Sequence, residues 1–384
     1  MDKSEYAGAL RNQCMSLPDL CEPQIEGIVL GLKDTIPAQV LKGVRRVIVT
    51  GCGDSYLAAK ACIPAFKKYA GAFASNFIAA RAIDVAQYLD LGRNAGGTLV
   101  IAVSASGGAS RLQELLRRAN SKGCLTLALT NRPDSKAVNE AKYSLIVNTP
   151  DFATPSPGLR SYYASYMGLY ALAVSLGQAK GIAKADALDD LFHQIRTYTA
   201  AVADRIEAID DQMFELAQTW KDFRAFETVG DDVDYSSAHF IAAKIVEVAG
   251  TMSSAMDSED WCHVNFFARD PEAIGTIVVG DVTANNRTRI GETAHQAAAV
   301  GRPVLLIANG SAQDFGIEEP ITVCTLPKTP AGYEFLSAML AHVPGSILAS
   351  YISALLGEPY FRNFIYRSGM TLGSSAVVVA DQEE

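Results

Sequence analysis

The residues most suggestive of chemistry are small hydroxyl and glycine residues that directly follow a buried apolar run. Residues 99–110 read Leu-Val-Ile-Ala-Val-Ser-Ala-Ser-Gly-Gly-Ala-Ser, and helical spacing of apolar residues begins at Arg111. This pattern predicts a strand, a tight loop and a helix N-terminus. The hydroxyls of Ser104, Ser106 and Ser110 would lie beside unpaired backbone N–H groups at the positive end of the helix dipole, which favours an anion. Because no P-loop lysine follows, a phosphate monoester suits this loop better than a nucleoside triphosphate.

A second turn of the same kind lies earlier in the chain. Residues 46–55 read Arg-Val-Ile-Val-Thr-Gly-Cys-Gly-Asp-Ser, which predicts a strand followed by a glycine-rich turn. A helix is expected to follow over 56–69, with Asp54 or Ser55 as its N-cap. Carboxyl ends of parallel strands share one edge of a sheet, where ligands of open α/β sheets bind. The turn lacks the third glycine of the dinucleotide fingerprint, so NAD is not expected.

Glu247 is a candidate general base in the second half of the chain. It lies in Ala-Ala-Lys-Ile-Val-Glu-Val-Ala-Gly, residues 242–250, on a predominantly apolar helix. Partial desolvation there is expected to raise the pKa of the carboxyl group toward neutrality, as a general base requires. The alternative is an ordinary helix charge pair with Lys244, three residues earlier.

The elements that position these residues alternate along most of the chain. We expect two series of strands separated by long helices over 160–177 and 187–219. The strands of the first series are predicted at 47–50, 72–78, 98–103, 124–130 and 143–148. Those of the second series are predicted at 224–229, 251–256, 273–280, 303–308 and 321–326. Helices are predicted between the strands, including 238–249, 289–300 and 334–356. This order predicts an α/β protein of two tandem doubly wound, flavodoxin-like parallel sheets. The expected divisions are an N-terminal helical segment (1–40), two domains (41–200 and 201–357) and a C-terminal tail (358–384).

Composition narrows the function classes. The chain has 384 residues, 49% of them hydrophobic, which is enough for two cores, and a net charge of −9 argues against nucleic acid or an anionic membrane as partner. The N-terminus shows no signal-peptide pattern, and the apolar stretch over 162–176 is too short for a membrane span. Seven scattered cysteines without Cys-x-x-Cys spacing favour reduced thiols in the cytoplasm, and no metal site or cofactor is expected.

The two turns together resemble the sugar isomerase (SIS) domain family, whose members bind phosphosugars and include the isomerase half of glucosamine-6-phosphate synthase. Gly51-Cys-Gly-Asp-Ser55 matches the family's Gly-x-Gly-x-Ser turn, and residues 104–107 match its Ser-x-Ser-Gly motif. The resemblance covers nearly the whole chain as two tandem SIS domains. It implies that Ser55, Ser104 and Ser106 bind the sugar phosphate, with the substrate-binding loops comprising Cys52, Gly53, Asp54, Ser55, Ser104, Ala105, Ser106, Gly107 and Ser110.

The chain departs from the family pattern at several places. Gly108-Ala109 replaces the usual Glu-Thr, so Ser110 either supplies the missing donor or caps the helix, and Ala105 replaces a larger polar residue. Cys52 fits the turn as a small residue, and the alternative is a reactive thiol. Arg160 lies near the family's Ser-Thr-Lys segment, where it either adds charge to the ligand site or is a solvated residue at a helix end. The run 281–289 duplicates the phosphate loop but lacks Ser-x-Ser-Gly, so a structural role or one in a dimer is expected.

The resemblance also implies roles for Glu247 and His263. In the family, a glutamate on this helix moves protons between sugar carbons, and a histidine after the next loop helps to open the ring. The local Glu-Leu-Lys-His-Gly-Pro pattern is poorly kept, because Glu259 precedes His263 with one extra residue and Val264-Asn265 replaces Gly-Pro. The competing histidines are His239, placed at the start of the Glu247 helix, and His295 and His342, which match no motif.

These observations predict a metal-independent enzyme that transfers a proton between C1 and C2 of an open-chain sugar phosphate or an anionic analogue such as a sulfonate. The first alternative is a fructosamine-6-phosphate deglycase or deaminase, a hydrolase that releases an amine, and the second is a non-catalytic phosphosugar sensor. Residues 361–368 contain no lysine of the kind that forms a Schiff base in the amidotransferase-linked isomerases, and the last lysine is Lys328. Both a plain isomerase and a deglycase work without it. The resemblance further implies a homodimer, with His263 acting on the partner's ligand.

Overall fold

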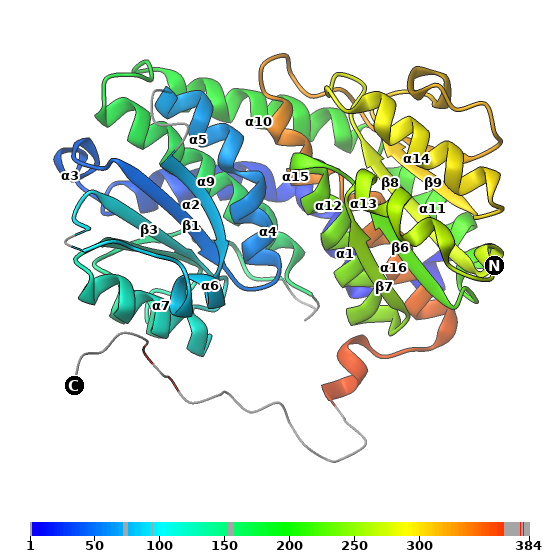
Figure 1. Ribbon diagram of the computed structural model, residues 1–384, viewed down its shortest axis with the longest axis horizontal. Helices are drawn as coiled ribbons and strands as arrows, with labels where there is room; N and C mark the ends of the chain where they lie inside the picture. Colours follow the sequence, from blue (N-terminus) through cyan, green and yellow to red (C-terminus); the bar gives the residue numbers. More distant parts are fainter. Residues whose placement is uncertain are drawn as a thin grey trace. The chain divides into compact units, whose positions relative to one another are not determined.

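The chain forms two compact units, each built around its own parallel sheet. The computed structural model describes residues 2–71, 76–93, 95–152 and 157–364, together with residues 377 and 379. The first-sheet unit consists mainly of residues 19–151 and 160–196. Among the described residues, the second-sheet unit consists of residues up to 18, residues 197–364 and the short segment between 152 and 159 (Figure 1).

The first sheet has five parallel strands in the order β2-β1-β3-β4-β5. Their bounds are β1 Arg46–Gly51, β2 Phe77–Arg81, β3 Thr98–Val103, β4 Leu125–Thr130 and β5 Tyr143–Ile146. The helices of this unit are α3 Ala38–Lys42, α4 Asp54–Ala61, α5 Ile63–Ala70, α6 Ala82–Gln87, α7 Ser110–Ser121, α8 Lys136–Glu140 and α9 Leu159–Ala179, together with most of α2 Leu17–Leu32. The strands are buried on both faces, as expected for a parallel sheet covered by helices on each side.

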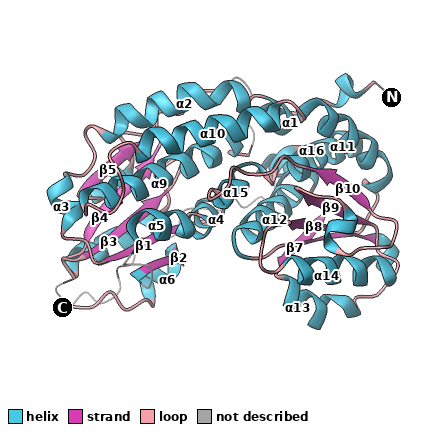
Figure 2. Cartoon of the chain, turned by 90° about the horizontal axis from the view of Figure 1, so that it is seen from above, coloured by secondary structure: helices cyan, strands magenta, loops and turns pink. Residues whose placement is uncertain are grey.

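The second sheet repeats this strand order as β7-β6-β8-β9-β10 (Figure 2). Its strands are β6 Ala225–Val229, β7 Met252–Met256, β8 Ile274–Gly280, β9 Val304–Ala308 and β10 Thr322–Thr325. Its longer helices are α1 Ala9–Met15, α11 Ile206–Trp220, α12 Asp232–Lys244, α13 Ser258–His263, α14 Arg287–Ala299, α15 Ser337–Leu340 and α16 Val343–Leu356. The helix α10, Ala187–Ala203, connects the two units in sequence. Two flavodoxin-like sheets of equal strand order confirm the predicted fold class.

Short helical segments complete the second-sheet unit. The segment Ile245–Ala249 is a π-helix that continues α12 directly. The remaining segments are 3-10 turns over Lys3–Tyr6, Asn265–Phe267, Pro271–Ala273, Ala312–Phe315, Glu334–Leu336 and Tyr360–Phe364.

Three predicted helices are interrupted in the structure. The helix predicted over 56–69 divides at Cys62, because Pro64 has no N–H and suits the first turn of a new helix. The helix predicted over 187–219 divides after Ala203. The segment 334–356 is composed of a 3-10 turn and two α-helices, with Pro344 in the first turn of α16.

Two other expectations need correction or lie partly outside the described residues. In the described part of the chain, the helical segment with the length and hydropathy of a membrane span is Glu334–Leu356 and not 162–176. However, 83% of its most apolar window is buried, as in the core helix of a globular protein. Residues 72–75 of the predicted strand 72–78 lie outside the described residues, and β2 runs from Phe77 to Arg81. Most of the predicted tail also lies outside them.

Candidate functional site

The loops that follow β1 and β3 leave the first sheet side by side. Gly51 pairs with Val103 in the parallel register, so Cys52 and Ser104 both start at the same edge. The strand order 2-1-3-4-5 reverses direction between β1 and β3, and such a switch point is where open α/β sheets bind ligands. The structure therefore brings the two sequence motifs together at the position where the fold forms a binding crevice.

The first loop depends on its two glycines. A Cβ on Gly51 would lie 2.7 Å from the Cβ of Ser55, so the loop packs closely against the end of β1. Gly53 has a φ of 52° and occupies the N-cap position of α4. The prediction of Asp54 or Ser55 as N-cap was therefore wrong, because the left-handed turn at Gly53 starts the helix earlier. Cys52 is exposed, and desolvation by the surrounding loop raises the pKa of its thiol, which disfavours a reactive thiolate.

The second loop is organised by its own hydroxyls. The Oγ atom of Ser104 accepts a hydrogen bond from the N–H of Gly107 at 3.0 Å, and Ser106 Oγ accepts one from Gly108 at 3.4 Å. Each hydroxyl keeps its own proton to donate. Gly107 has a φ of 62°, and a Cβ there would lie 2.2 Å from the Oγ of Ser135, so no other residue fits.

Ser110 does not cap the following helix. It is the first residue of α7, and Ala109 occupies the cap position without a side-chain hydrogen bond. Of the two alternatives for Ser110, the structure therefore disfavours capping.

Ala105 contributes to the loop through its backbone, because its carbonyl accepts hydrogen bonds from the side chain of Thr130 and the N–H of Asn131, both at 3.2 Å.

Two arginines that the sequence reasoning missed lie at the same edge of the sheet. Arg111, in the first turn of α7, is close enough to Cys52 for its charge to act on the thiol, and it pairs with the buried Glu114 at 2.7 Å. Arg81 ends β2 opposite Gly51, with its guanidinium 5.9 Å from the ring centroid of Tyr56. The sequence predicts that this strand ends at residue 78, which leaves Arg81 away from the edge of the sheet. For Arg111, its position directly after Ser110 is a sequence signal that could have identified it.

Arg160 has a different environment from these two arginines. Its guanidinium donates a 3.4 Å hydrogen bond to the backbone carbonyl of Pro150, and its charge interacts with Asp19. Partial burial lowers the pKa of Arg160. These contacts lie between the start of α9 and the loop after β5. They do not by themselves connect Arg160 with the loop that contains Ser104 and Ser106.

Glu247 lies in the second-sheet unit, within the π-helical segment. Its Oε2 accepts a hydrogen bond from Lys244 Nζ at 2.7 Å, and Lys244 is 1% exposed, with its ammonium 4.5 Å from the ring centroid of Phe240. The side chain of Glu247 is 32% exposed, so it is less desolvated than the apolar sequence indicated. The charge pair therefore forms, and it does not exclude proton transfer, because the carboxylate still reaches solvent. π-helical turns recur at functional sites.

His263 ends α13 and faces solvent within this chain. Its Nε2 lies 2.9 Å from Glu259 Oε1, and both side chains are more than half exposed. Glu259 also pairs with Arg289 at 2.7 Å. The extra residue between Glu259 and His263 creates an i, i+4 spacing, which places both side chains on one face of the helix.

A buried network anchors α13 to the second sheet. Glu227 Oε2, on β6, accepts a 2.8 Å hydrogen bond from Trp261 Nε1 and pairs with Arg302. The guanidinium of Arg302 lies 5.0 Å from the Trp261 ring and donates to the backbone carbonyl of Asn265. These contacts fix the residues on both sides of His263.

The three competing histidines, His239, His295 and His342, make contacts within the folded chain. His239 lies in the middle of α12, which begins at Asp232 and not near His239 as predicted, and its ring meets Tyr235 edge-on at 5.7 Å. His295 pairs with Glu319 at 2.7 Å. His342 is fully buried, and desolvation lowers its pKa to about 3.

The first sheet and its two loops fall within a segment that matches a known domain family. Residues 41–175 match the family model of the SIS domain. Glutamine–fructose-6-phosphate aminotransferase (isomerizing) of Streptococcus pneumoniae is 28% identical over 214 residues, which are 55% of this chain and 34% of that protein. The chain therefore matches about a third of the length of this curated relative.

Solved structures share the fold across both sheets. The C-terminal domain of glucosamine-fructose-6-phosphate aminotransferase from Francisella tularensis superposes with a TM-score of 0.78 at 15% identity, covering 94% of this chain and 100% of that one. Tagatose-6-phosphate ketose/aldose isomerase from Escherichia coli gives a TM-score of 0.64 at 16% identity, covering 93% and 95%. The segment that matches the SIS domain model carries the first sheet, and the second sheet repeats the strand order of the first.

Proposed function

We propose that the protein binds a sugar phosphate, or a sugar with a similar tetrahedral anion, and transfers a proton between C1 and C2 of the open chain. The observation that supports this most strongly is the pair of loops at the β1/β3 switch point. There, the loops that carry Ser55, Ser104 and Ser106 leave neighbouring strands, and each leads into a helix, in a chain of net charge −9. Holding the remote phosphate orients the reacting carbons, which is a major source of rate.

The proposed acid–base residues are Glu247 and His263. Glu247 moves the proton between the carbons, with the Lys244 ammonium stabilising its carboxylate. His263 assists ring opening. We propose that Cys52, Gly53, Asp54, Ala105, Gly107 and Ser110 complete the loops, with Arg160 as the least supported member. Binding needs no metal in this scheme, since hydroxyl, amide and guanidinium groups supply the donors.

Arg111 gives the first test of the anion site. Replacing Arg111 by Gln removes the guanidinium beside the loops, and the KM for the sugar phosphate is expected to rise about tenfold, since a charge-assisted contact contributes roughly 1.5–3 kcal/mol. Steady-state kinetics measures this change. The matched control is Arg117→Gln on the same helix, where the arginine pairs with Glu140 away from the loops. Equal KM values in both variants would contradict the placement of the phosphate beside Arg111.

Two alternative activities stay open at the same site. A fructosamine-6-phosphate deglycase or deaminase uses the same anion loops and proton transfer, then releases an amine. Amine release from a fructose-6-phosphate–amino acid conjugate, assayed beside fructose-6-phosphate isomerisation, separates the two. Binding without any turnover would favour the phosphosugar sensor.

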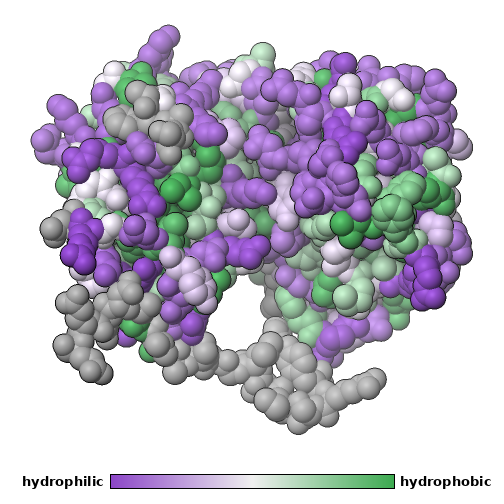
Figure 3. All heavy atoms as spheres, viewed as in Figure 1, coloured by the Kyte–Doolittle hydropathy of each residue, from purple (hydrophilic) through white to green (hydrophobic). Residues whose placement is uncertain are grey.

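We further propose a cytoplasmic homodimer in which the second-sheet unit contributes to the contact. Four large apolar side chains near the acid–base candidates are exposed: Val246 beside Glu247, Val264 and Phe267 beside His263, and Met252 on the edge strand β7. In Figure 3, hydrophobic side chains gather on part of the visible surface of the second-sheet unit. Exposed apolar groups of this kind are typical of protein–protein contacts.

A single substitution tests the dimer. Phe267 is 76% exposed, so Phe267→Asp leaves the core intact and is expected to convert a sedimenting dimer to a monomer, because a charge would be buried in the contact. Tyr88, 78% exposed on the first-sheet unit, provides the control Tyr88→Asp. Identical sedimentation of the two variants and the native chain would exclude Phe267 from the contact.

A further inference from the structure

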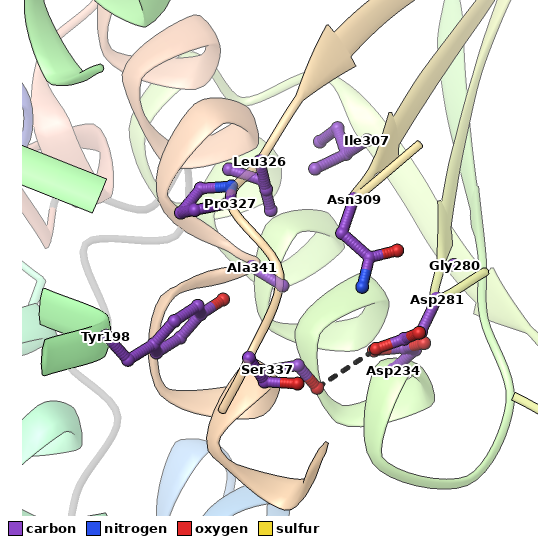
Figure 4. A pocket seen from close by; sticks show the side chains of 11 residues that line it. Tyr198, Asp234, Gly280, Asp281, Ile307, Asn309, Leu326, Pro327, Ser337 and Ala341 are labelled. Carbon is purple, nitrogen blue, oxygen red and sulfur yellow. Dashed lines mark hydrogen bonds between the residues drawn. The ribbon is translucent and has the colours of Figure 1, made fainter. Parts of the chain in front are cut away.

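A small polar pocket lies at the carboxyl ends of β8, β9 and β10, within the second-sheet unit. It has room for about one water-sized molecule, and its polar lining comes from Tyr198, Asp234, Asp281, Asn309 and Ser337 (Figure 4). The β6/β8 pair is the switch point of the second sheet, as β1/β3 is of the first. The fold thus repeats its binding position, but acidic residues replace the serine hydroxyls.

The two carboxylates are buried and only partly engaged. Asp234 is 7% exposed and accepts a 3.4 Å hydrogen bond from Ser337 Oγ on its Oδ1 atom. Asp281 is 8% exposed, and its Oδ1 accepts from the N–H of Thr283 at 2.7 Å and from its hydroxyl at 2.6 Å. The second oxygen of each carboxylate has no hydrogen-bond partner among the described residues. Two buried negative charges of this kind attract a cation or a strong donor.

Tyr198 supplies an independent indication of a ligand. Its side chain is 2% exposed, and its phenol oxygen points into the pocket (Figure 4). Among the described residues it has no hydrogen-bond partner. The pocket is the space from which this hydroxyl can take a partner, so a molecule in the pocket would form a hydrogen bond with it.

The charge of the pocket determines which molecule fits. Burial, followed by the charge of Asp281, raises the pKa of Asp234 to about 7, and Asp231 and Asp232 act in the same direction. An anion such as a sugar phosphate would be repelled. The one lysine in the lining loop, Lys328, is exposed, and its charge acts on Asp314.

We propose that this pocket binds an ammonium group, either free ammonium or the end of a primary amine. An ammonium offers three or four N–H donors in a tetrahedral arrangement. The free oxygens of Asp234 and Asp281 can accept two of them, and the Tyr198 and Ser337 oxygens the others. The positive charge offsets the repulsion between the carboxylates. This site is separate from the proposed phosphosugar loops.

Thermal unfolding at pH 8 in ammonium chloride, compared with sodium chloride at equal ionic strength, tests the proposal. Ammonium at ten times its Kd is expected to raise the Tm by roughly 3 °C, and the increment should grow with the logarithm of concentration. Asp281→Asn and Tyr198→Phe should abolish the increment. Both variants are expected to fold, because Asn still accepts from Thr283 and Phe fills the same space. Asp204→Asn, at an exposed position, should retain it.

Further salts distinguish the two sources of the ammonium group. An increment from methylammonium as well as ammonium indicates an amine site, and one from ammonium alone indicates the free ion. An equal increment from potassium chloride, or an increment that survives Asp281→Asn, would overturn the proposal, as would no increment of ammonium over sodium. No sugar phosphate is present, so the result does not depend on the proposed function.

Discussion

Replacing Glu247 by Gln is expected to lower turnover of the sugar phosphate by about 10²–10⁴-fold while leaving its affinity close to that of the native chain. The carboxylate is the proposed proton carrier, whereas the proposed contacts to the anion come from the loops after β1 and β3. Gln keeps the size and one acceptor oxygen, but it cannot take up a proton from carbon. Steady-state turnover and isothermal titration with the same sugar phosphate measure the two effects.

The variant also removes the charge that pairs with Lys244, which is 1% exposed. An unpaired buried ammonium is destabilising, so loss of activity alone would be ambiguous. Lys244→Met combined with Glu247→Gln removes both charges and should recover stability without recovering turnover. Glu215→Gln, an exposed glutamate on α11, is the matched control and should stay active. Near-native turnover in Glu247→Gln would remove Glu247 from the mechanism.

The second large effect concerns stability. Asp234→Asn is expected to stabilise the protein by up to about 4 kcal/mol above pH 7, in buffer without ammonium. The native fold raises the pKa of Asp234 from 3.8 to about 7, so between these values the unfolded chain has already lost a proton that the folded chain retains. Stability contributed by the protonated group is therefore lost as the pH rises from about 4 to 7. Asn carries no titrating proton, so the gain should be near zero at pH 4.

The pKa shift of His342 changes the stability of the protein with pH in the opposite direction. The fold lowers its pKa from 6.5 to about 3, so the unfolded chain takes up a proton as the pH falls through this range and the folded chain does not. Stability is then lost as the pH falls from about 6.5 to 3. Between pH 4 and 6.5 the two contributions oppose each other, each changing by about 1.4 kcal/mol per pH unit.

Urea unfolding of the native chain and of Asp234→Asn from pH 4 to 8 measures this difference. The variant should lose stability toward acid more steeply than the native chain between pH 6.5 and 4, because the His342 contribution is no longer opposed. A constant difference between the two chains across this range would show that Asp234 titrates normally in the folded protein.

The strands and the anion loops could be predicted from sequence because their signals are local. The apolar run of β3 ends at Ser104, and the glycine-rich turn follows β1, so burial and turn chemistry indicate the same boundaries. The repeated element order predicted the two sheets, although the second half lacks the serine motif. These are the cases in which local propensity and the final fold agree.

Other features depend on contacts between distant segments. Arg81 lies at the edge of the sheet only because β2 ends three residues beyond the predicted end at residue 78. Pairing with β1 sets the end of that strand. The pocket around Tyr198 and Asp234 joins α10 to the second sheet, a contact that sequence periodicity does not encode. The exposure of Glu247 likewise follows from the π-helical turn that continues α12.

Hydrogen–deuterium exchange most directly tests whether this protein moves a proton between C1 and C2 of a phosphorylated sugar. The protein is incubated in D₂O with a panel of ketohexose and aldohexose 6-phosphates, and deuterium at C1 and C2 is followed by NMR. The account predicts exchange into at least one sugar phosphate, none into the matching unphosphorylated sugar, and loss of exchange in Glu247→Gln. Equal exchange with and without the phosphate, or no exchange with a sugar phosphate that binds, would contradict it.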